Sequence, residues 1–236
     1  MSYIDGFVVA VPAANKELYL KQAATALPMF KEFGASHMVE SWGDDVPEGK
    51  VTDFRRAVKA EPDEVIVFSW LTYPDRAARD VAGKKMMEDP RMENFSDMPF
   101  DGKRMIYGGF APIFESGSSG TFGYVDGSLI AVPTDKRDEY KAYAKHCAAV
   151  FHEYGAKRIV DAWGDDVPDG KITDFRGAVK AGEDETVVFC WIEWPSKAVR
   201  DEAWPKVMAD PRIQEAKAPF DLGRMVYGGF RPILDA

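Results

Sequence analysis

Thiol and imidazole side chains are scarce in this sequence, which has two cysteines and three histidines among 236 residues. Cys147 and Cys190 both lie in the second half of a repeated sequence whose first half has Ala26 and Ser69 at the matching positions, so the two halves share neither a disulfide nor a metal motif. We therefore predict two free core thiols in a protein of the reducing cytoplasm. The sequence gives no reason to predict a cofactor.

The sequence also has no excess of basic residues and no long apolar run. The formal net charge is −9, whereas binding to nucleic acid or to an anionic membrane depends on clustered Lys and Arg. No apolar run approaches the roughly 20 residues that a membrane-spanning helix needs. The opening MSYIDGFVVAV lacks a basic start and is interrupted by Asp5, so it is typical of a strand rather than a secretory signal. Neither nucleic acid nor a membrane is a predicted partner.

One long passage occurs twice in the chain. WGDDVPEGKVTDFRRAVKA begins at Trp42, and WGDDVPDGKITDFRGAVKA begins at Trp163. Further along each half, RMIYGGF begins at Arg104 and RMVYGGF begins at Arg224. Repetition at a fixed period indicates a duplicated structural unit.

The duplication predicts three parts: a first module over residues 1–114, a Gly/Ser-rich linker over residues 115–122, and a second module over residues 123–236. No histidine recurs at the matching position of the other half. A symmetric His-ligated haem or metal site is therefore not predicted, while a single asymmetric site stays open.

Each module has the pattern strand, helix, strand, long loop, strand, helix, strand. In the first half, aromatic and β-branched runs predict strands over residues 3–11, 38–42, 65–73 and 104–113. In the first helix of this half, Pro28 predicts a kink or an early end. The second helix is predicted to start at an Asp75 cap and to stop before Pro90. This order is the ferredoxin-like βαββαβ order of an α+β protein.

The third strand is apolar on both faces, which indicates that both faces are buried. Its smaller side chains, such as Val67, fit beneath helices. Phe68 and Trp70 on its other face need a second sheet to cover them. The other half can supply that sheet. We therefore predict an intramolecular dimeric α+β barrel, a pseudo-dimer whose further oligomerisation stays open.

The motifs W-G-D-D-V-P-x-G-K-x-T-D-F, Asp-Pro-Arg and R-M-x-Y-G-G-F resemble those of the YbaA-like bacterial proteins of unknown function, a family in the dimeric α+β barrel group. The resemblance covers each half from end to end. It implies the ferredoxin-like barrel, and it implies no activity, because the family has none established. The wider barrel group includes cofactor-free monooxygenases and haem enzymes, but a shared fold is a weak argument for function.

Charged residues of the repeated passage are the first candidate ligand contacts. They are Asp44, Asp45, Lys50, Asp53 and Arg55, with the copies Asp165, Asp166, Lys171, Asp174 and Arg176. In a structural interpretation they cap a short helix and hold the long loop through local bonds. In a functional interpretation they form a rim at the barrel mouth that contacts a ligand. A cation site is a third interpretation, but the spacing matches no calcium loop, and no metal is predicted.

Carboxylates repeated within strands are the second set of candidates. Asp5 recurs as Asp126, and Glu40 recurs as Asp161. The side chains on the opposite face of the first strand are small enough to lie beneath helices, so we predict that these carboxylates face the barrel interior. A carboxylate buried there is either paired or has a raised pKa. The candidate partners and lining residues are Trp42, Trp70 and Arg104, with the copies Trp163, Trp191 and Arg224. A structural ion pair is the alternative interpretation.

Two functional hypotheses follow from these candidates. The first is binding of a small-molecule ligand in the barrel or at its mouth, with cofactor-independent chemistry as an extension. It requires a cavity, so an interior filled by side chains would contradict it. The second is a non-catalytic interaction or assembly module that presents two equivalent acidic loops to a protein partner. The sequence leaves both open and identifies no substrate.

Overall fold

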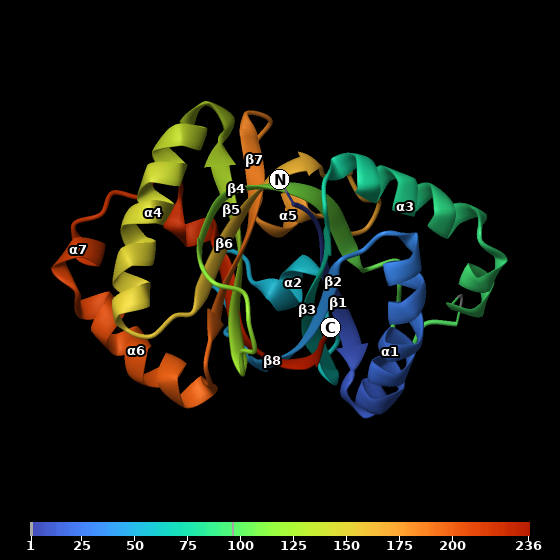
Figure 1. Ribbon diagram of the computed structural model, residues 1–236. Coiled ribbons are helices and arrows are strands. Elements are labelled where there is room, and N and C mark those ends of the chain that lie inside the picture. Colours follow the sequence, from blue (N-terminus) through green and yellow to red (C-terminus); the bar gives the residue numbers. More distant parts are fainter. Residues whose placement is uncertain (1, 96) are drawn as a thin grey trace.

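The computed structural model describes residues 2–95 and 97–236, and its elements follow the βαββαβ order twice (Figure 1). The first half contains β1 (Tyr3–Pro12), α1 (Lys16–Phe33), β2 (His37–Asp45), α2 (Phe54–Ala57), β3 (Glu64–Tyr73), α3 (Arg76–Glu88) and β4 (Ile106–Gly117). The second half contains β5 (Tyr124–Pro133), α4 (Arg137–Glu153), β6 (Arg158–Asp166), α5 (Phe175–Ala178), β7 (Glu185–Trp194), α6 (Lys197–Ala209), α7 (Pro211–Gln214) and β8 (Val226–Asp235). Short 3-10 helices are η1 (Ala13–Asn15), η2 (Pro90–Phe95), η3 (Thr134–Lys136) and η4 (Leu222–Arg224).

The strands close into one barrel in the order β1-β3-β2-β8-β5-β7-β6-β4, and every pairing is antiparallel. The halves join at two places, because β2 pairs with β8 and β6 pairs with β4. Each half thereby completes the sheet of the other. The predicted α+β fold, two ferredoxin-like modules forming an internal pseudo-dimer, is confirmed.

Helices surround the barrel as an outer layer. Figure 1 shows α1 and α3 on one side, and α4, α6 and α7 on the other. The short helices α2 and α5 lie between the halves and contact each other, and their Phe54 and Phe175 belong to the interior core. None of the helices within the described residues combines the length and apolar character that crossing a membrane requires.

Aromatic rings from both sheets occupy the barrel interior. Phe68 stacks on Phe189 with ring centroids 4.4 Å apart, and Trp70 stacks on Trp191 at 4.5 Å. The larger side chains of the third strand therefore face the other sheet, as predicted. Gly6 makes room for this packing, since a Cβ built there would lie 2.7 Å from the Phe189 ring. Among the described residues these stacked rings fill the interior, so a ligand inside the barrel lacks the cavity that the hypothesis requires, and binding at the mouth stays a prediction.

Several element boundaries differ from the expectations. α1 runs through Pro28 and ends at Phe33, because burial of Met29 and Phe33 offsets the one backbone bond that proline removes. β4 begins at Ile106 and extends to Gly117, three residues into the range expected for the linker. Phe122 at the linker end is buried against Trp70, at 6.5 Å between rings. As predicted, Asp75 caps α3 by accepting a hydrogen bond from the Ala78 backbone N–H.

Candidate functional site

The adjacent aspartates of the repeated passage end β2 and cross from the first half to the second. Asp44 accepts hydrogen bonds from the Tyr124 hydroxyl at 3.0 Å and from Arg231 Nε at 2.7 Å. Asp45 accepts one from Arg200 Nη1 at 2.8 Å. These bonds tie the end of β2 to the helix and strands of the opposite half.

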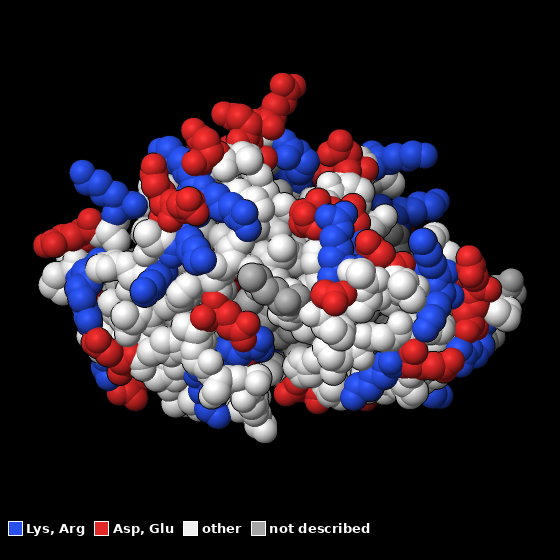
Figure 2. Space-filling view, turned by 45° about the horizontal axis from the view of Figure 1, so that its top comes forward, with Lys and Arg blue, Asp and Glu red and all other residues white. Residues whose placement is uncertain are grey.

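The second copy makes the reciprocal contacts. Asp165 accepts from the Tyr3 hydroxyl at 2.9 Å and from Arg76 Nη1 at 2.6 Å. Asp166 accepts from Arg79 Nη1 at 2.6 Å. Acidic and basic side chains are accordingly interspersed over the face drawn in Figure 2. The near-verbatim repetition of the two aspartates has a structural cause, because each copy of the motif fastens its own half to the other.

The remainder of the passage folds on itself. Asp53 accepts from the backbone N–H groups of Arg56 at 2.8 Å and Gly49 at 3.1 Å, which caps α2 and closes the loop. Arg55 donates to the backbone carbonyl of Glu64 at 2.8 Å. The copies Asp174 and Arg176 repeat both arrangements. Within the described residues, the ammonium groups of Lys50 and Lys171 have no hydrogen-bond or ion-pair partner.

Asp5 and Asp126 lie beneath helices, and the prediction that they face the barrel interior is wrong. Asp5 accepts from Arg79 Nε at 2.8 Å, and burial raises its pKa to about 6 against the opposing effect of Arg79. Asp126 accepts from Arg200 Nε at 2.8 Å and from the indole N–H groups of Trp194 and Trp204, and burial raises its pKa as well. The opposite face of β1, with small side chains such as Gly6 and Ala10, points inward instead. The rings of the aromatic core leave space there only for small side chains.

Arg104 and Arg224 are not the partners of these acids. Each lies before the last strand of its half and forms a two-pronged ion pair with an acid at the start of the third strand, Glu64 or Glu185, with both distances 2.7 Å. A planar guanidinium matches a carboxylate in this way. Sequence reasoning missed both glutamates, because a charged residue beside a predicted strand is more often exposed.

Glu40 and Asp161 also lie between the sheet and the helices rather than in the interior. Glu40 accepts a hydrogen bond from the Tyr19 hydroxyl of α1 at 2.6 Å, and Asp161 accepts one from the Tyr140 hydroxyl of α4 at 2.6 Å. The contacts of the described residues give neither carboxyl group a Lys, Arg or His partner. Burial raises the pKa of Glu40 to about 7 and also raises the pKa of Asp161.

Aromatic rings surround each of these carboxyl groups. The Tyr19 ring lies 6.4 Å from Trp42 and 5.9 Å from Phe100. The Tyr140 ring has matching neighbours in Trp163 at 6.4 Å and Phe220 at 5.8 Å. A cation covers each tryptophan, Lys16 in the first half and Arg137 in the second. Each half therefore holds, in an aromatic layer, a carboxyl group whose pKa is raised by burial.

The predicted site residues thus fall into separate places. Glu40 and Trp42 share the sheet–helix layer, Trp70 lies inside the barrel, and Asp5 and Arg104 belong to two different ion-pair clusters. Ligand binding by these residues stays a prediction. Among the described residues, no group of three His, Cys, Asp or Glu side chains is placed to hold a metal ion.

The family described as "Protein of unknown function (DUF1428)" matches residues 2–102 and again residues 123–222. The chain belongs to the DUF1428 family. The uncharacterised protein YbaA of Escherichia coli K12 is 63% identical over 116 residues, which are 49% of this chain and 99% of YbaA, and YbaA of Shigella flexneri matches equally. The resemblance drawn from the repeated motifs is confirmed. One DUF1428 module makes up nearly all of YbaA, whereas this chain carries two.

Solved structures share the fold of this DUF1428 protein at low sequence identity. A putative monooxygenase of Fusobacterium nucleatum aligns with a TM-score of 0.61 at 9% identity, covering 99% of this chain and 93% of the other. A putative monooxygenase of Lactobacillus acidophilus aligns at 0.58 and 10%, covering 100% and 95%. An anthrone oxidase-like protein aligns at 0.53 and 11%, covering 100% and 92%. At such identities the likeness shows the fold.

The two DUF1428 modules of the chain differ around the buried acid. Asp161 has Cys190 nearby, whose thiol lies 3.3 Å from the Tyr140 hydroxyl, whereas the matching residue beside Glu40 is Ser69. Both cysteines are free thiols. Outside α4 and α7 lies a groove of about 460 Å³ whose lining includes Tyr143. The Tyr143 ring packs edge-on against Phe220, which packs on Tyr140, so aromatic contacts lead from this groove toward Asp161.

Proposed function

We propose that the protein binds a small, largely apolar molecule between the sheet and the helices of each half, where Glu40 and Asp161 exchange a proton with it. The observation that carries the proposal is a buried carboxyl group in each half that a tyrosine hydrogen-bonds at 2.6 Å and that has no cationic partner among the described residues. An acid that serves only structure is more often paired with Arg or Lys, as Asp5 and Glu64 are.

The environment of Glu40 suits acid–base chemistry at neutral pH. With its pKa raised to about 7 by burial, the group is present in both its protonated and ionised forms near pH 7. The Tyr19 hydroxyl donates to the ionised form, and the Trp42 and Phe100 rings pack around that tyrosine as an apolar wall. Such a site can take a proton from a carbon beside a carbonyl group without a cofactor.

The proteins that share the fold support the class of ligand. The solved structures include putative monooxygenases and an anthrone oxidase-like protein. Anthrone is an aromatic ketone with an acidic methylene group, and it fits the chemistry of an aromatic layer that holds one carboxyl group. We therefore take anthrone as the probe of the proposed site.

The test measures exchange of the anthrone methylene protons for deuterium by proton NMR in D₂O at pD 7. The native protein should accelerate the exchange, and a Glu40→Gln, Asp161→Asn double variant should lose the acceleration. Glu48→Gln, which removes an exposed carboxyl group from the loop that follows β2, is the matched control and should keep the acceleration. Exchange no faster than in buffer, or equal acceleration by the double variant, would overturn the proposal.

The interaction-module hypothesis is less well supported by these contacts. It needs the aspartates of the repeated passage to be free for a partner, but Asp44 and Asp45 are bonded to the opposite half of the same chain. These aspartates therefore already hold the two halves of the chain together.

A further inference from the structure

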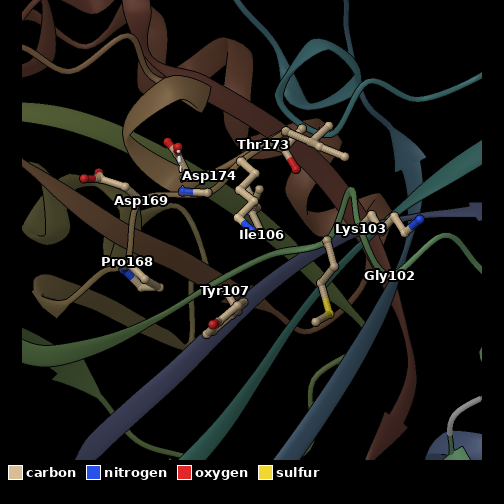
Figure 3. Close-up of a pocket in the computed structure, with 12 residues that line it drawn as sticks. Gly102, Lys103, Ile106, Tyr107, Pro168, Asp169, Thr173 and Asp174 are labelled. Atoms are coloured by element: carbon tan, nitrogen blue, oxygen red, sulfur yellow. Dashed lines mark hydrogen bonds between the residues drawn. The ribbon is translucent and has the colours of Figure 1, made fainter.

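A second groove lies at the rim of the barrel, where the repeated loop of the second half meets the first half. It has a volume of about 390 Å³ and is lined by residues 102–103, 105–107 and 168–174. Figure 3 shows Lys103 and Pro168 on opposite sides of it, with Tyr107 between them. Its size is within the range of small-molecule sites.

Two ammonium groups at this groove lack partners among the described residues, whereas its two aspartates have partners. Neither Lys103 nor Lys171 has a side-chain hydrogen bond or ion pair there. Asp174 is committed to the backbone N–H groups of Gly170 and Gly177. Asp169 points to solvent, 4.0 Å from Arg176. The lining carries two lysines and two aspartates, and among the described residues its two ammonium groups have no partner, so they are available to an anion.

The apolar part of the groove lining combines the buried Ile106 with exposed side chains. Met105, Ile106 and Pro168 belong to it, and Tyr107 and Ile172 are 48% and 43% exposed. Because both side chains line the same groove, they offer an apolar surface on which a ring can pack. A flat ring would cover this surface, while a charged substituent at its edge could reach the lysines.

We propose that this groove binds a small aromatic anion, with the ring on Tyr107 and Ile172 and the carboxylate or sulfonate on Lys171 and Lys103. Ring burial supplies the apolar contribution, and the lysines supply charge-assisted hydrogen bonds. This site is distinct from the sheet–helix layer of Glu40 and Asp161, and neither proposal depends on the other.

The matching position of the other half is changed in a way that provides a control. There, residues aligned with Gly102 and Lys103 are Leu222 and Gly223, so the copy of the groove keeps Lys50 and Tyr227 but lacks the second lysine. We therefore expect one anion site in each chain, and substitutions of Lys50 should leave it intact.

The test is a fluorescence titration with 8-anilinonaphthalene-1-sulfonate. The Lys103→Gln, Lys171→Gln double variant should weaken binding at least about tenfold, and Lys50→Gln should change it less than about twofold. N-phenyl-1-naphthylamine, the same rings without the sulfonate, should bind the native protein and the double variant equally. These lysines are at the surface, so a thermal melt should show that all variants are folded.

Three outcomes would overturn the proposal. The first is unchanged sulfonate affinity in the double variant, and the second is an equal loss in Lys50→Gln. The third is an equal loss of the uncharged probe, which would mean that the lysines do not act through their charge.

Discussion

At the scale of single residues, the two halves use carboxyl groups in two different ways. Asp5 and Asp126 are buried against Arg79 and Arg200, so each charge has a compensating partner. Glu40 is hydrogen-bonded by the hydroxyl groups of Tyr19 and Ser69, and among the described residues it has no cationic partner. A buried carboxyl group without a cation keeps its proton to a higher pH, because losing the proton leaves an unpaired charge in an apolar layer.

This difference predicts how stability depends on pH at Glu40. Its pKa is raised from the ordinary 4.5 to about 7, so the folded chain binds this proton more tightly than the unfolded chain does. The contribution is fully present below pH 4.5 and is lost as the pH rises through 7. Relative to the native protein, Glu40→Gln should therefore gain about 3 kcal/mol of unfolding free energy between pH 4 and pH 8. Urea unfolding at both values measures this gain. A difference that is the same at both would show that Glu40 titrates normally.

At the scale of elements, the repeated loop depends on one side chain that closes it at both ends. Asp53 is 3% exposed and accepts from the backbone of Arg56 and of Gly49. Asp53→Ala should lower the unfolding free energy by about 1–2 kcal/mol, since it removes a helix cap and opens the loop. Lys50→Ala, three residues away and exposed, should stay within about 0.5 kcal/mol of the native protein. Equal losses in the two variants would mean that the cap contributes nothing specific.

The secondary-structure elements and their order could be predicted from the sequence. Which face of the first two strands points into the barrel could not. Apolar alternation and the prolines place β1, β3 and α3 within a few residues of their observed bounds. Alternation says which residues share a face, but it does not say which face is inside. Side-chain size gave the right answer for Phe68 and the wrong one for Asp5, because Gly6 faces inward to make room for a ring of the other half. Such contacts between distant segments are set by packing in the whole barrel, which a local pattern does not contain.

At the scale of the whole molecule, the linker does less to hold the halves together than the interface does. Each half completes the other's sheet, and four aspartates with their arginine and tyrosine partners lie across the two junctions. Stacked rings of Phe68, Phe189, Trp70 and Trp191 fill the space between the sheets. A half on its own would expose this aromatic surface to water, at a cost of about 25 cal/mol for each Å².

The interface therefore predicts that the chain survives a cut between its halves. Residues 118–121 are exposed, so a protease recognition sequence inserted there can be cleaved in the folded protein. After cleavage the two fragments should co-elute from a sizing column at the volume of the intact protein. Thermal stability should become dependent on concentration, because association is then bimolecular. A cut protein that carries Asp45→Asn and Asp166→Asn should dissociate at a higher concentration, since each substitution weakens a bond to Arg200 or Arg79. Fragments that separate as folded single modules would show that the aromatic faces do not require each other, and the barrel would then depend on the linker.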